Sequence, residues 1–304
     1  FADKFKKPAL LYNDLRLLEA RNYNWNHRLL PMVMVFAGRI DPDSVTPPTR
    51  KLWAGTGDTP VVLIHTDWSW SETDKYLSIK GGSAGSSHAH MDAGSFVYDA
   101  FGVRWSMDIG RQSYAPLEVA LKALGGNLWS MRQASMRWDV SRLNNFFHST
   151  ISVNGAKHRV DGAATLVQVI NTATEQGGTF DLSTVIGDQI SSALRTVKLI
   201  DDKDLTVIDA ITARTDRNAK VRWTLVTPAV PTVENDRIVL TSNGKTMYLT
   251  ASEENGTEIG YRTWSAEPVH SYDDPNPGVY RVGFEATVAA GSSATFTTTL
   301  SPGK

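Results

Sequence analysis

The residues best suited to chemistry lie in one short stretch, where a loop rich in glycine and serine, residues 81–87, runs into His88, Ala89 and His90. In an extended chain, residues i and i+2 point to the same side, so both imidazoles would lie on one face. Such a pair can present one histidine to a metal ion and leave the other for acid–base chemistry, because imidazole both ligates metals and titrates near neutral pH.

Two further residues could join this pair. We expect an outward strand over residues 95–100, a tight turn and a return strand over residues 103–109, which brings Asp108 back toward the histidines. Simple hairpin register leaves Asp108 a few residues from direct opposition, so a bulge or a twist is needed. His148 precedes another predicted strand. Two imidazoles and a carboxylate with an open fourth position suit zinc.

The spacing of these residues in the sequence leaves alternatives to this metal site open. Asp92 is a second candidate oxygen ligand, or a partner that orients a histidine. Histidines in a sheet protein are also often packed or solvated without a chemical role. The chain contains no cysteine, which excludes disulfides, zinc ribbons and thiol catalysis, so any metal site must use histidine and carboxylate ligands.

The charge is unevenly distributed along the chain. The net charge is −1, yet residues 101–160 contain eight Lys or Arg against three acidic residues. A local positive stretch suits an anionic ligand, although a solvated face with chance clustering is an equal alternative. The candidates for binding acid groups by bidentate hydrogen bonds are Arg104, Arg111, Arg137 and Arg142. Each of them could instead be an ordinary surface or core-edge arginine.

Elements of two kinds must position these residues. Leucines at helix spacing predict helices within residues 6–40, and prolines and glycines place a boundary within residues 41–58. We therefore expect a helical segment with its linker over residues 1–58 and a β domain over residues 59–304. No apolar run approaches the roughly 20 residues of a membrane-spanning helix.

Alternating apolar and polar residues predict many strands after the boundary. The predicted strands are residues 61–64, 76–79, 151–153, 165–172, 190–200, 205–213, 220–226, 237–241, 246–251, 278–289 and 293–300, besides the two named above. Residues 116–138 are expected to be helical or irregular, and Asn154-Gly155 predicts a hairpin turn. The expected fold is mainly β, a large antiparallel β-sandwich of stacked sheets.

The chemical motifs resemble those of a known family. His88-Ala89-His90-Met91-Asp92-Ala93-Gly94-Ser95-Phe96, followed by residues 102–110 and Tyr114, is similar to the central motif of the heparinase II/III-like polysaccharide lyases. Residues 147–155 resemble the later histidine-bearing strand and turn of that family. The likeness extends over residues 58–162 and is nearest to heparinase II within the family.

The resemblance implies a role for each candidate residue. Family members bind a mainly structural zinc ion through the second histidine of His-x-His, the aspartate that ends the return strand, and the later histidine, which correspond to His90, Asp108 and His148. The first histidine, His88 here, lines the cleft and takes part in catalysis. Tyr114 resembles a tyrosine that follows the aspartate in many members, so it is the second catalytic candidate.

The resemblance also implies a domain partner. These lyases join an N-terminal α/α toroid to the β-sandwich, so the helices before residue 41 would be the end of the toroid. The toroid supplies a main acid/base tyrosine and an Asn or His that neutralises the uronate, and these would precede Phe1. Since the chain begins without Met or a secretion signal, we interpret it as a fragment or processed form of a bacterial periplasmic or secreted enzyme, which could be inactive alone. Ser149 stands where the family usually has Asn, a change that should spare the metal ligand.

The implied function is β-elimination at a uronic acid of a glycosaminoglycan, with heparin or heparan sulfate as the leading substrate. The alternatives are a non-catalytic carbohydrate-binding β module, a lyase acting on another uronate polymer such as alginate, and a zinc hydrolase with Asp92 as its base. A module would not need His88 in an open cleft. Trp105, Trp129 and Trp138 could stack on sugars, although core packing is expected for most of them.

Overall fold

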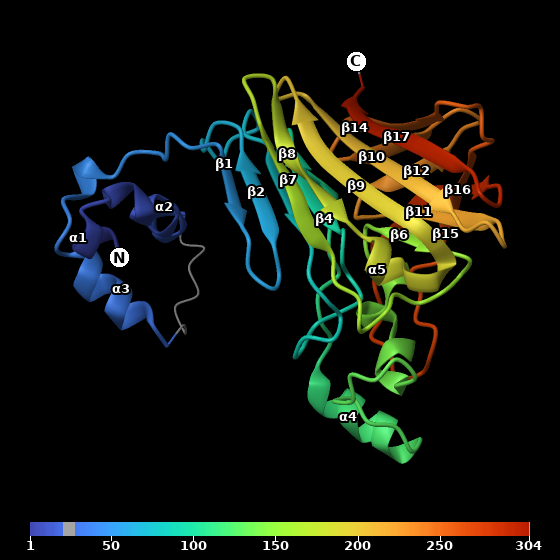
Figure 1. Cartoon of the computed structure of the whole chain (residues 1–304). Coiled ribbons are helices and arrows are strands. Elements are labelled where there is room, and N and C mark those ends of the chain that lie inside the picture. The colour runs from blue at the N-terminus through green and yellow to red at the C-terminus, as the bar shows by residue number, and fades with distance from the viewer. Residues whose placement is uncertain (21–27, 304) are drawn as a thin grey trace. The chain divides into compact units, whose positions relative to one another are not determined.

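The computed structural model describes residues 1–20 and 28–303 (Figure 1). Its contacts divide the chain into two compact units, and each is described by itself. The smaller unit comprises Phe1–Lys51 with Asp67–Trp70, and the larger comprises Leu52–Thr66 with Ser71–Lys304.

The smaller unit is helical. Its elements are α1 (Ala2–Phe5), the 3-10 helix η1 (Pro8–Leu11), α2 (Tyr12–Glu19), α3 (Leu30–Ala37) and the 3-10 helix η2 (Pro42–Ser44). The helices expected within residues 6–40 are present as α2 and α3, while residues 21–27 of that span lie outside the described residues. The Tyr12 hydroxyl donates to the Trp68 carbonyl at 3.0 Å. No described helix is both long and apolar enough to cross a membrane.

The larger unit begins with a five-stranded antiparallel sheet that carries the central motif. Its strands are β1 (Leu52–Gly55), β2 (Val61–His65), β3 (Tyr76–Lys80), β4 (Phe96–Ala100) and β5 (Val103–Ser106), paired in chain order. Phe101 (φ 58°) and Gly102 (φ 70°) form the tight turn between β4 and β5, as the left-handed pair of a two-residue hairpin requires. Tyr98 pairs with Ser106, whereas the next residue, Asp99, pairs with Arg104. The bulge that the sequence required is therefore present.

An eight-stranded antiparallel sheet forms the other layer. Its strands are β7 (Thr165–Asn171), β8 (Glu175–Asp181), β9 (Ile190–Ile200), β10 (Asp204–Ala213), β12 (Val230–Val233), β13 (Ile238–Ser242), β14 (Lys245–Glu253) and β17 (Ser293–Pro302). They are ordered β12-β13-β14-β17-β10-β9-β8-β7. The short helices α5 (Ser183–Ile186) and η6 (Gly187–Gln189) connect β8 to β9.

A four-stranded antiparallel sheet completes the sandwich. It contains β6 (Ile151–Val153), β11 (Ala219–Thr227), β15 (Gly260–Trp264) and β16 (Tyr280–Val288), in the order β15-β16-β11-β6. The predicted hairpin after β6 is wrong. Asn154 and Gly155 do turn, with φ 53° and 66°, but β6 pairs only with β11 among the described strands, because the Asn154 side chain and backbone bond to Lys220 at the start of β11.

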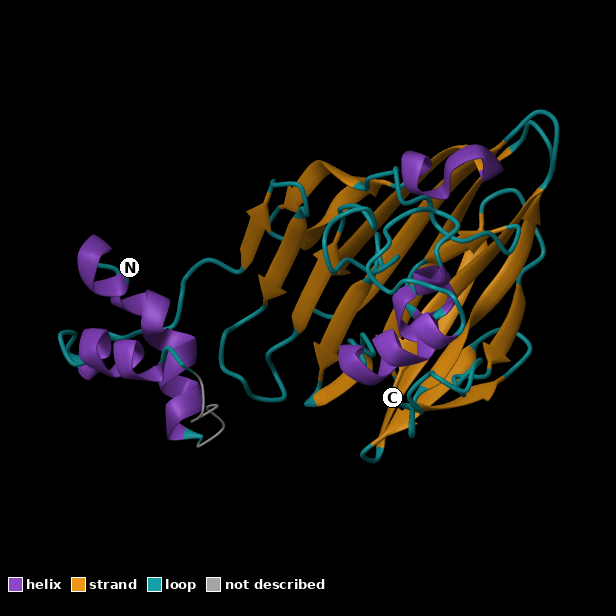
Figure 2. Ribbon diagram, turned by 90° about the horizontal axis from the view of Figure 1, so that it is seen from below, coloured by secondary structure: helices purple, strands orange, loops and turns teal. Residues whose placement is uncertain are grey.

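The inner faces of the three sheets share one apolar core, and the layers are visible in Figure 2. The Trp223 ring from β11 stacks on Phe284 from β16 at 5.8 Å between centroids, and Phe284 contacts Phe296 from β17 at 5.7 Å. These rings are almost completely buried, so they supply much of the apolar area that holds the layers together. The mainly β, antiparallel sandwich expected from the sequence is confirmed.

A second, smaller core lies beneath the loops of the motif. The elements around it are α4 (Tyr114–Ala123) and the 3-10 helices η3 (Met136–Asp139), η4 (Ser141–Leu143) and η5 (Asn145–Phe147). Its buried members are Ala84, Met91, Leu117, Leu121, Leu128, Trp138, Val140 and Leu143. Residues 116–138, expected to be helical or irregular, therefore contain both kinds of structure. They pack beneath the loop that carries His88 and His90.

Candidate functional site

The loop that carries the histidines is anchored where β3 ends. Gly82 (φ +90°) forms an isolated antiparallel bridge with Ala164, and a Cβ on Gly81 would lie 2.6 Å from the Ala164 carbonyl oxygen. Only glycine permits this close approach together with the left-handed backbone. The Ser83 hydroxyl then donates to the Val160 carbonyl at 3.1 Å. The glycine-rich run thus fixes the start of the loop against the chain near residues 160–164.

His88 has a strained backbone and an exposed side chain. Its φ is 61°, a left-handed value that is uncommon for a residue with a Cβ and is often found at functional sites. The next residue, Ala89, donates its N–H to the Ser86 carbonyl at 3.1 Å and accepts at its carbonyl from Arg137 Nη2 at 2.8 Å. These bonds fix the backbone next to His88, so that its side chain stays exposed to solvent. The extended backbone expected over His-x-His is therefore wrong at its first histidine.

His88 belongs to an aromatic cluster. Its ring is stacked on Tyr114 at 5.8 Å between centroids and meets Trp129 edge-on at 5.5 Å. Tyr114 is the first residue of α4, so the helix places its ring beside the loop. The structure therefore brings both predicted catalytic residues into ring contact, although 26 positions separate them in the sequence.

The second histidine lies within a different group. The His90 and His148 rings are 5.6 Å apart, and His148 Nδ1 lies 2.7 Å from Asp108 Oδ2. The other oxygen, Asp108 Oδ1, accepts the Gly110 N–H at 2.7 Å. His148 is fully buried, and its Nε2 has no hydrogen-bond partner in the described part of the chain. The three predicted ligands are thus neighbours.

The protonation of this group follows from its burial and mutual contacts. Burial, followed by the charge of His148, lowers the pKa of His90 to about 4, so its imidazole is neutral at pH 7. Burial acts to raise the pKa of Asp108, but the charge and hydrogen bond of His148 outweigh it and lower that pKa overall. Burial likewise acts to lower the pKa of His148, and Asp108 reverses the direction and raises it.

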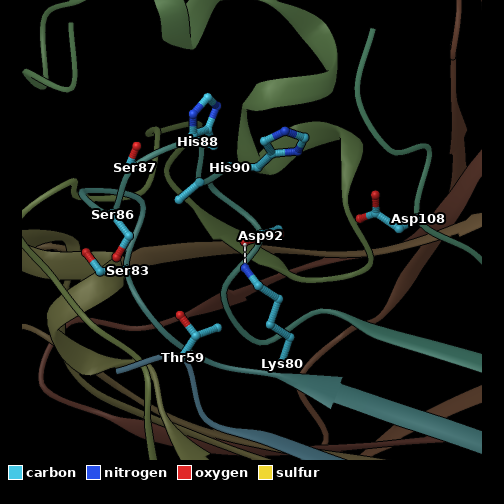
Figure 3. A pocket seen from close by; sticks show the side chains of 10 residues that line it. Thr59, Lys80, Ser83, Ser86, Ser87, His88, His90, Asp92 and Asp108 are labelled. Atoms are coloured by element: carbon cyan, nitrogen blue, oxygen red, sulfur yellow. Dashed lines mark hydrogen bonds and ion pairs between the residues drawn. The ribbon is translucent and has the colours of Figure 1, made fainter. Parts of the chain in front are cut away.

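His88, His90 and Asp108 border a polar pocket of about 330 Å³ (Figure 3). It is lined by Thr59, Lys80, Ser83, Ser86, Ser87, His88, Ala89, His90, Asp92 and Asp108. Lys80, the last residue of β3, forms an ion pair with Asp92 across the pocket. Sequence reasoning missed Lys80, although its place directly before Gly81-Gly82 could have drawn attention to it.

The predicted zinc ligands fit zinc in their chemistry. A neutral imidazole, an ionised carboxylate and a second imidazole are ligands that zinc accepts, and a buried Nε2 without a partner is an atom that a metal could satisfy. However, in residues 1–20 and 28–303 no three His, Asp or Glu side chains are grouped closely enough to hold an ion. Zinc binding therefore stays a prediction.

One of the four predicted substrate-binding arginines, Arg137, is buried and bonded within the protein. Arg137 is completely buried, and its Nη1 and Nη2 donate to the Leu128 and Ala89 carbonyls at 3.0 and 2.8 Å. Burial lowers the pKa of Arg137, and a hydrogen bond with Tyr114 opposes that shift. Because Arg137 has no accessible face, we assign it to holding the His88 loop and Tyr114 rather than a ligand.

The other three arginines lie at the surface or near it. Arg104 forms a bidentate pair with Asp99 at 2.6 and 2.7 Å. Arg142 donates to Asn276 Oδ1 at 2.9 Å and to the Arg111 and Pro275 carbonyls, both at 3.0 Å, so it joins two loops.

Arg111 is exposed, and its guanidinium lies 6.0 Å from the centre of the Tyr114 ring. Among the predicted four, Arg111 is therefore the one that an anionic ligand could reach beside the pocket.

The comparisons with known proteins agree with this arrangement. Residues 63–297 match the family model described as heparinase II/III-like, C-terminal. This chain belongs to the heparinase II/III-like family. No curated protein sequence matches it. The heparinase-like chain carries the family's C-terminal domain, and its predicted nearness to heparinase II within the family stays a prediction.

Solved structures share the fold of this heparinase-like chain. A mutant of the heparan sulfate lyase HepC from Pedobacter heparinus superposes with a TM-score of 0.66 at 16% identity, covering 97% of this chain and 42% of its own. A heparinase III superposes with a TM-score of 0.65 at 13% identity, covering 98% and 42%. The chain therefore spans about two fifths of the length of these proteins, and at such identities the likeness concerns the fold.

Proposed function

We propose that this chain is the zinc-bearing C-terminal part of a polysaccharide lyase that cleaves a uronic-acid-containing glycosaminoglycan, with heparin or heparan sulfate as the leading substrate. One observation carries the proposal: His88 is exposed at a polar pocket with its ring against Tyr114. A non-catalytic carbohydrate-binding module would give no reason to hold a histidine in a left-handed conformation at the edge of a pocket.

The reaction would be β-elimination. A base removes the proton from C5 of the uronate, the C4–O4 bond breaks with its electrons leaving on O4, a double bond forms between C4 and C5, and an acid protonates O4. Imidazole and phenol suit these transfers, because each can accept or donate a proton. The ring contact between His88 and Tyr114 supports a share for both groups in these transfers, beside the main acid/base tyrosine of the proposed toroid.

The metal is proposed to hold the loop rather than to react. His90, Asp108 and His148 would bind it, and the ion would fix the segment that presents His88 two residues earlier. Elemental analysis of the purified chain tests this. About one zinc ion per chain, lost in both His90→Ala and Asp108→Ala, is expected for a site with this ligand set. Wild-type protein that is purified without chelator in the presence of zinc, and contains none, would refute the site.

The chain is further proposed to act together with an N-terminal α/α toroid of the same polypeptide. In support, α3 exposes apolar side chains that a water-facing helix rarely carries: Met32 is 51%, Met34 64% and Val35 55% exposed. The toroid would supply the main acid/base tyrosine and the group that neutralises the uronate. Export to the periplasm or beyond belongs to the same proposal, since the polymer is an extracellular one.

Lyase chemistry is tested with the full-length polypeptide. The unsaturated product absorbs in the ultraviolet, whereas a hydrolase acting on the same polymer gives no such product. We expect ultraviolet absorbance to rise with heparan sulfate, and loss of His88 in His88→Ala to lower kcat by about 10²–10⁴-fold, the usual contribution of an acid–base group. Cleavage without that absorbance would favour a hydrolase, and absorbance with alginate alone would move the substrate to another uronate polymer.

A further inference from the structure

Trp129 differs from the tryptophans that hold the sandwich together. Trp105, Trp138 and Trp223 are all 0% exposed, whereas Trp129 is 44% exposed. Leaving so much of an indole in water forgoes a large part of the free energy that its burial would contribute. An exposed tryptophan beside a catalytic candidate is therefore a feature that folding alone does not explain.

The exposed indole is carried by a rigid segment. The Trp129 N–H donates to Asn127 Oδ1 at 2.9 Å, and the Asn127 carbonyl accepts from the Ser135 hydroxyl at 3.3 Å. Leu128 is 1% exposed in the second core, and its carbonyl accepts from buried Arg137 at 3.0 Å. Because Asn127 and Leu128 are held by hydrogen bonds and by packing in the second core, the backbone that carries the indole is preorganised.

The indole stands beside the reacting pair. Its ring is 5.5 Å from His88 and 5.3 Å from Tyr114, at 78° and 80° to them, while those two rings are stacked on each other. The exposed guanidinium of Arg111 lies 6.0 Å from the Tyr114 ring and has no carboxylate partner in the described residues. A partly exposed indole and a guanidinium without a carboxylate partner among the described residues thus flank His88 and Tyr114.

This pair of features matches one kind of ligand. A pyranose ring of an acidic polysaccharide has an apolar face of C–H groups and carries its carboxylate or sulfate at the rim. We propose that Trp129 is a stacking platform for a sugar ring of an anionic polysaccharide, with Arg111 binding the acid group of that sugar. The inference rests on the proposed function, because it places the polymer at His88, and it adds a specificity-determining residue to that site.

The test compares tryptophan variants of the full-length polypeptide, with a heparan sulfate tetrasaccharide as the probe. Trp129→Ala removes the platform, and Trp129→Leu keeps apolar bulk to support His88 while it removes the flat aromatic face. Trp53→Ala is the matched control, because Trp53 is 49% exposed on β1 and lacks the ring contacts with His88 and Tyr114 that Trp129 makes. Calorimetric titration gives the Kd, lyase kinetics give kcat and KM, and thermal melting verifies folding.

The expected results separate binding from support. Trp129→Ala and Trp129→Leu should each weaken binding about tenfold and raise KM similarly, since aromatic contacts contribute up to about 1.5 kcal/mol. Their kcat should stay within a few-fold of wild type, because a platform binds ground and transition states alike. Trp53→Ala should leave Kd, KM and kcat unchanged.

Other outcomes overturn the inference. A fall in kcat at unchanged Kd would mean that Trp129 only supports His88. Unchanged kinetics in both Trp129 variants would remove the platform while leaving the proposed function in place. If wild type neither binds nor cleaves any uronate polymer, including alginate oligomers, the proposed function fails, and the platform fails with it.

Discussion

Breaking the buried ion pair between Arg195 on β9 and Asp209 on β10 should strongly destabilise the β unit. Arg195 Nε and Nη2 donate to the two carboxylate oxygens of Asp209 at 2.7 and 3.0 Å, and the side chains are 0% and 1% exposed. Arg195 Nη1 also donates to the carbonyls of Gly94 at 3.0 Å and Ser149 at 3.3 Å. The same guanidinium therefore joins the core to two of the three segments that carry the predicted metal ligands, those of His90 and His148.

The informative perturbation is Arg195→Met. It removes the cation and leaves the Asp209 carboxylate buried without compensation, which should lower the free energy of unfolding by about 3–5 kcal/mol. The double variant Arg195→Met/Asp209→Leu removes both charges and should recover most of that loss, because apolar residues of similar volume often replace a buried pair at little cost. It should remain about 1–2 kcal/mol below wild type, since the Gly94 and Ser149 carbonyls lose their donor.

Urea unfolding followed by tryptophan fluorescence measures these differences as shifts of the midpoint at a constant m-value. Arg104→Met is the matched control, because it breaks an equally bidentate pair with Asp99 whose side chains are 50% and 33% exposed, and its cost should be under about 1 kcal/mol. The reasoning is refuted if Arg195→Met costs no more than Arg104→Met. It is also refuted if the double variant is no more stable than the single one.

Two further predictions concern the site and its support. Gly94 has φ +76°, and a Cβ there would lie 2.8 Å from Leu182 Cδ1, so Gly94→Ala should add a steric cost of about 1–3 kcal/mol to its backbone strain. Gly155→Ala, at φ +66° with nothing within 4 Å, should cost only the backbone strain of about 1–2 kcal/mol, and equal midpoints for the two variants in urea would contradict the steric argument. Tyr114→Phe keeps the ring stacked on His88 but removes the hydroxyl, so it should lower kcat of the full-length enzyme by about 10²-fold or more. Loss of the hydrogen bond to buried Arg137 should also lower the free energy of unfolding by about 1–3 kcal/mol. An unchanged kcat would remove Tyr114 from the acid–base pair.

The sequence alone determined the features that depend on neighbouring residues. Alternation predicted most strands, and the need for a bulge in the hairpin before Asp108 followed from counting residues around a two-residue turn. The combined motifs around His88, Asp108 and His148 indicated the family that the match over residues 63–297 shows. These features can be predicted from sequence because they depend on local geometry and on the chemistry of particular side chains.

Four strands escaped prediction because their pattern is set by distant partners. The strand β8, with the sequence Glu-Gln-Gly-Gly-Thr-Phe-Asp, contains glycines that argue against a strand. In the fold a Cβ on Gly177 would lie 2.2 Å from the Val197 carbonyl oxygen, and one on Gly178 would lie 3.0 Å from Val62. These glycines allow neighbouring strands to approach closely, which only the tertiary structure reveals. The short strands β1, β12 and β15 lie at the edges of their sheets and have little alternation to detect.

Only the tertiary structure decided which polar residues meet. It placed Asp108 against His148 over 40 positions and buried Arg137, which the charge pattern had offered as a ligand-binding residue. It also exposed Trp129 and set Lys80 into the pocket. Burial and long-range contact depend on how whole layers pack, and a residue's type and spacing do not contain that information. The sequence therefore supplied the chemical groups of this site, and the packing of its loops onto the second core determined which of them face the pocket.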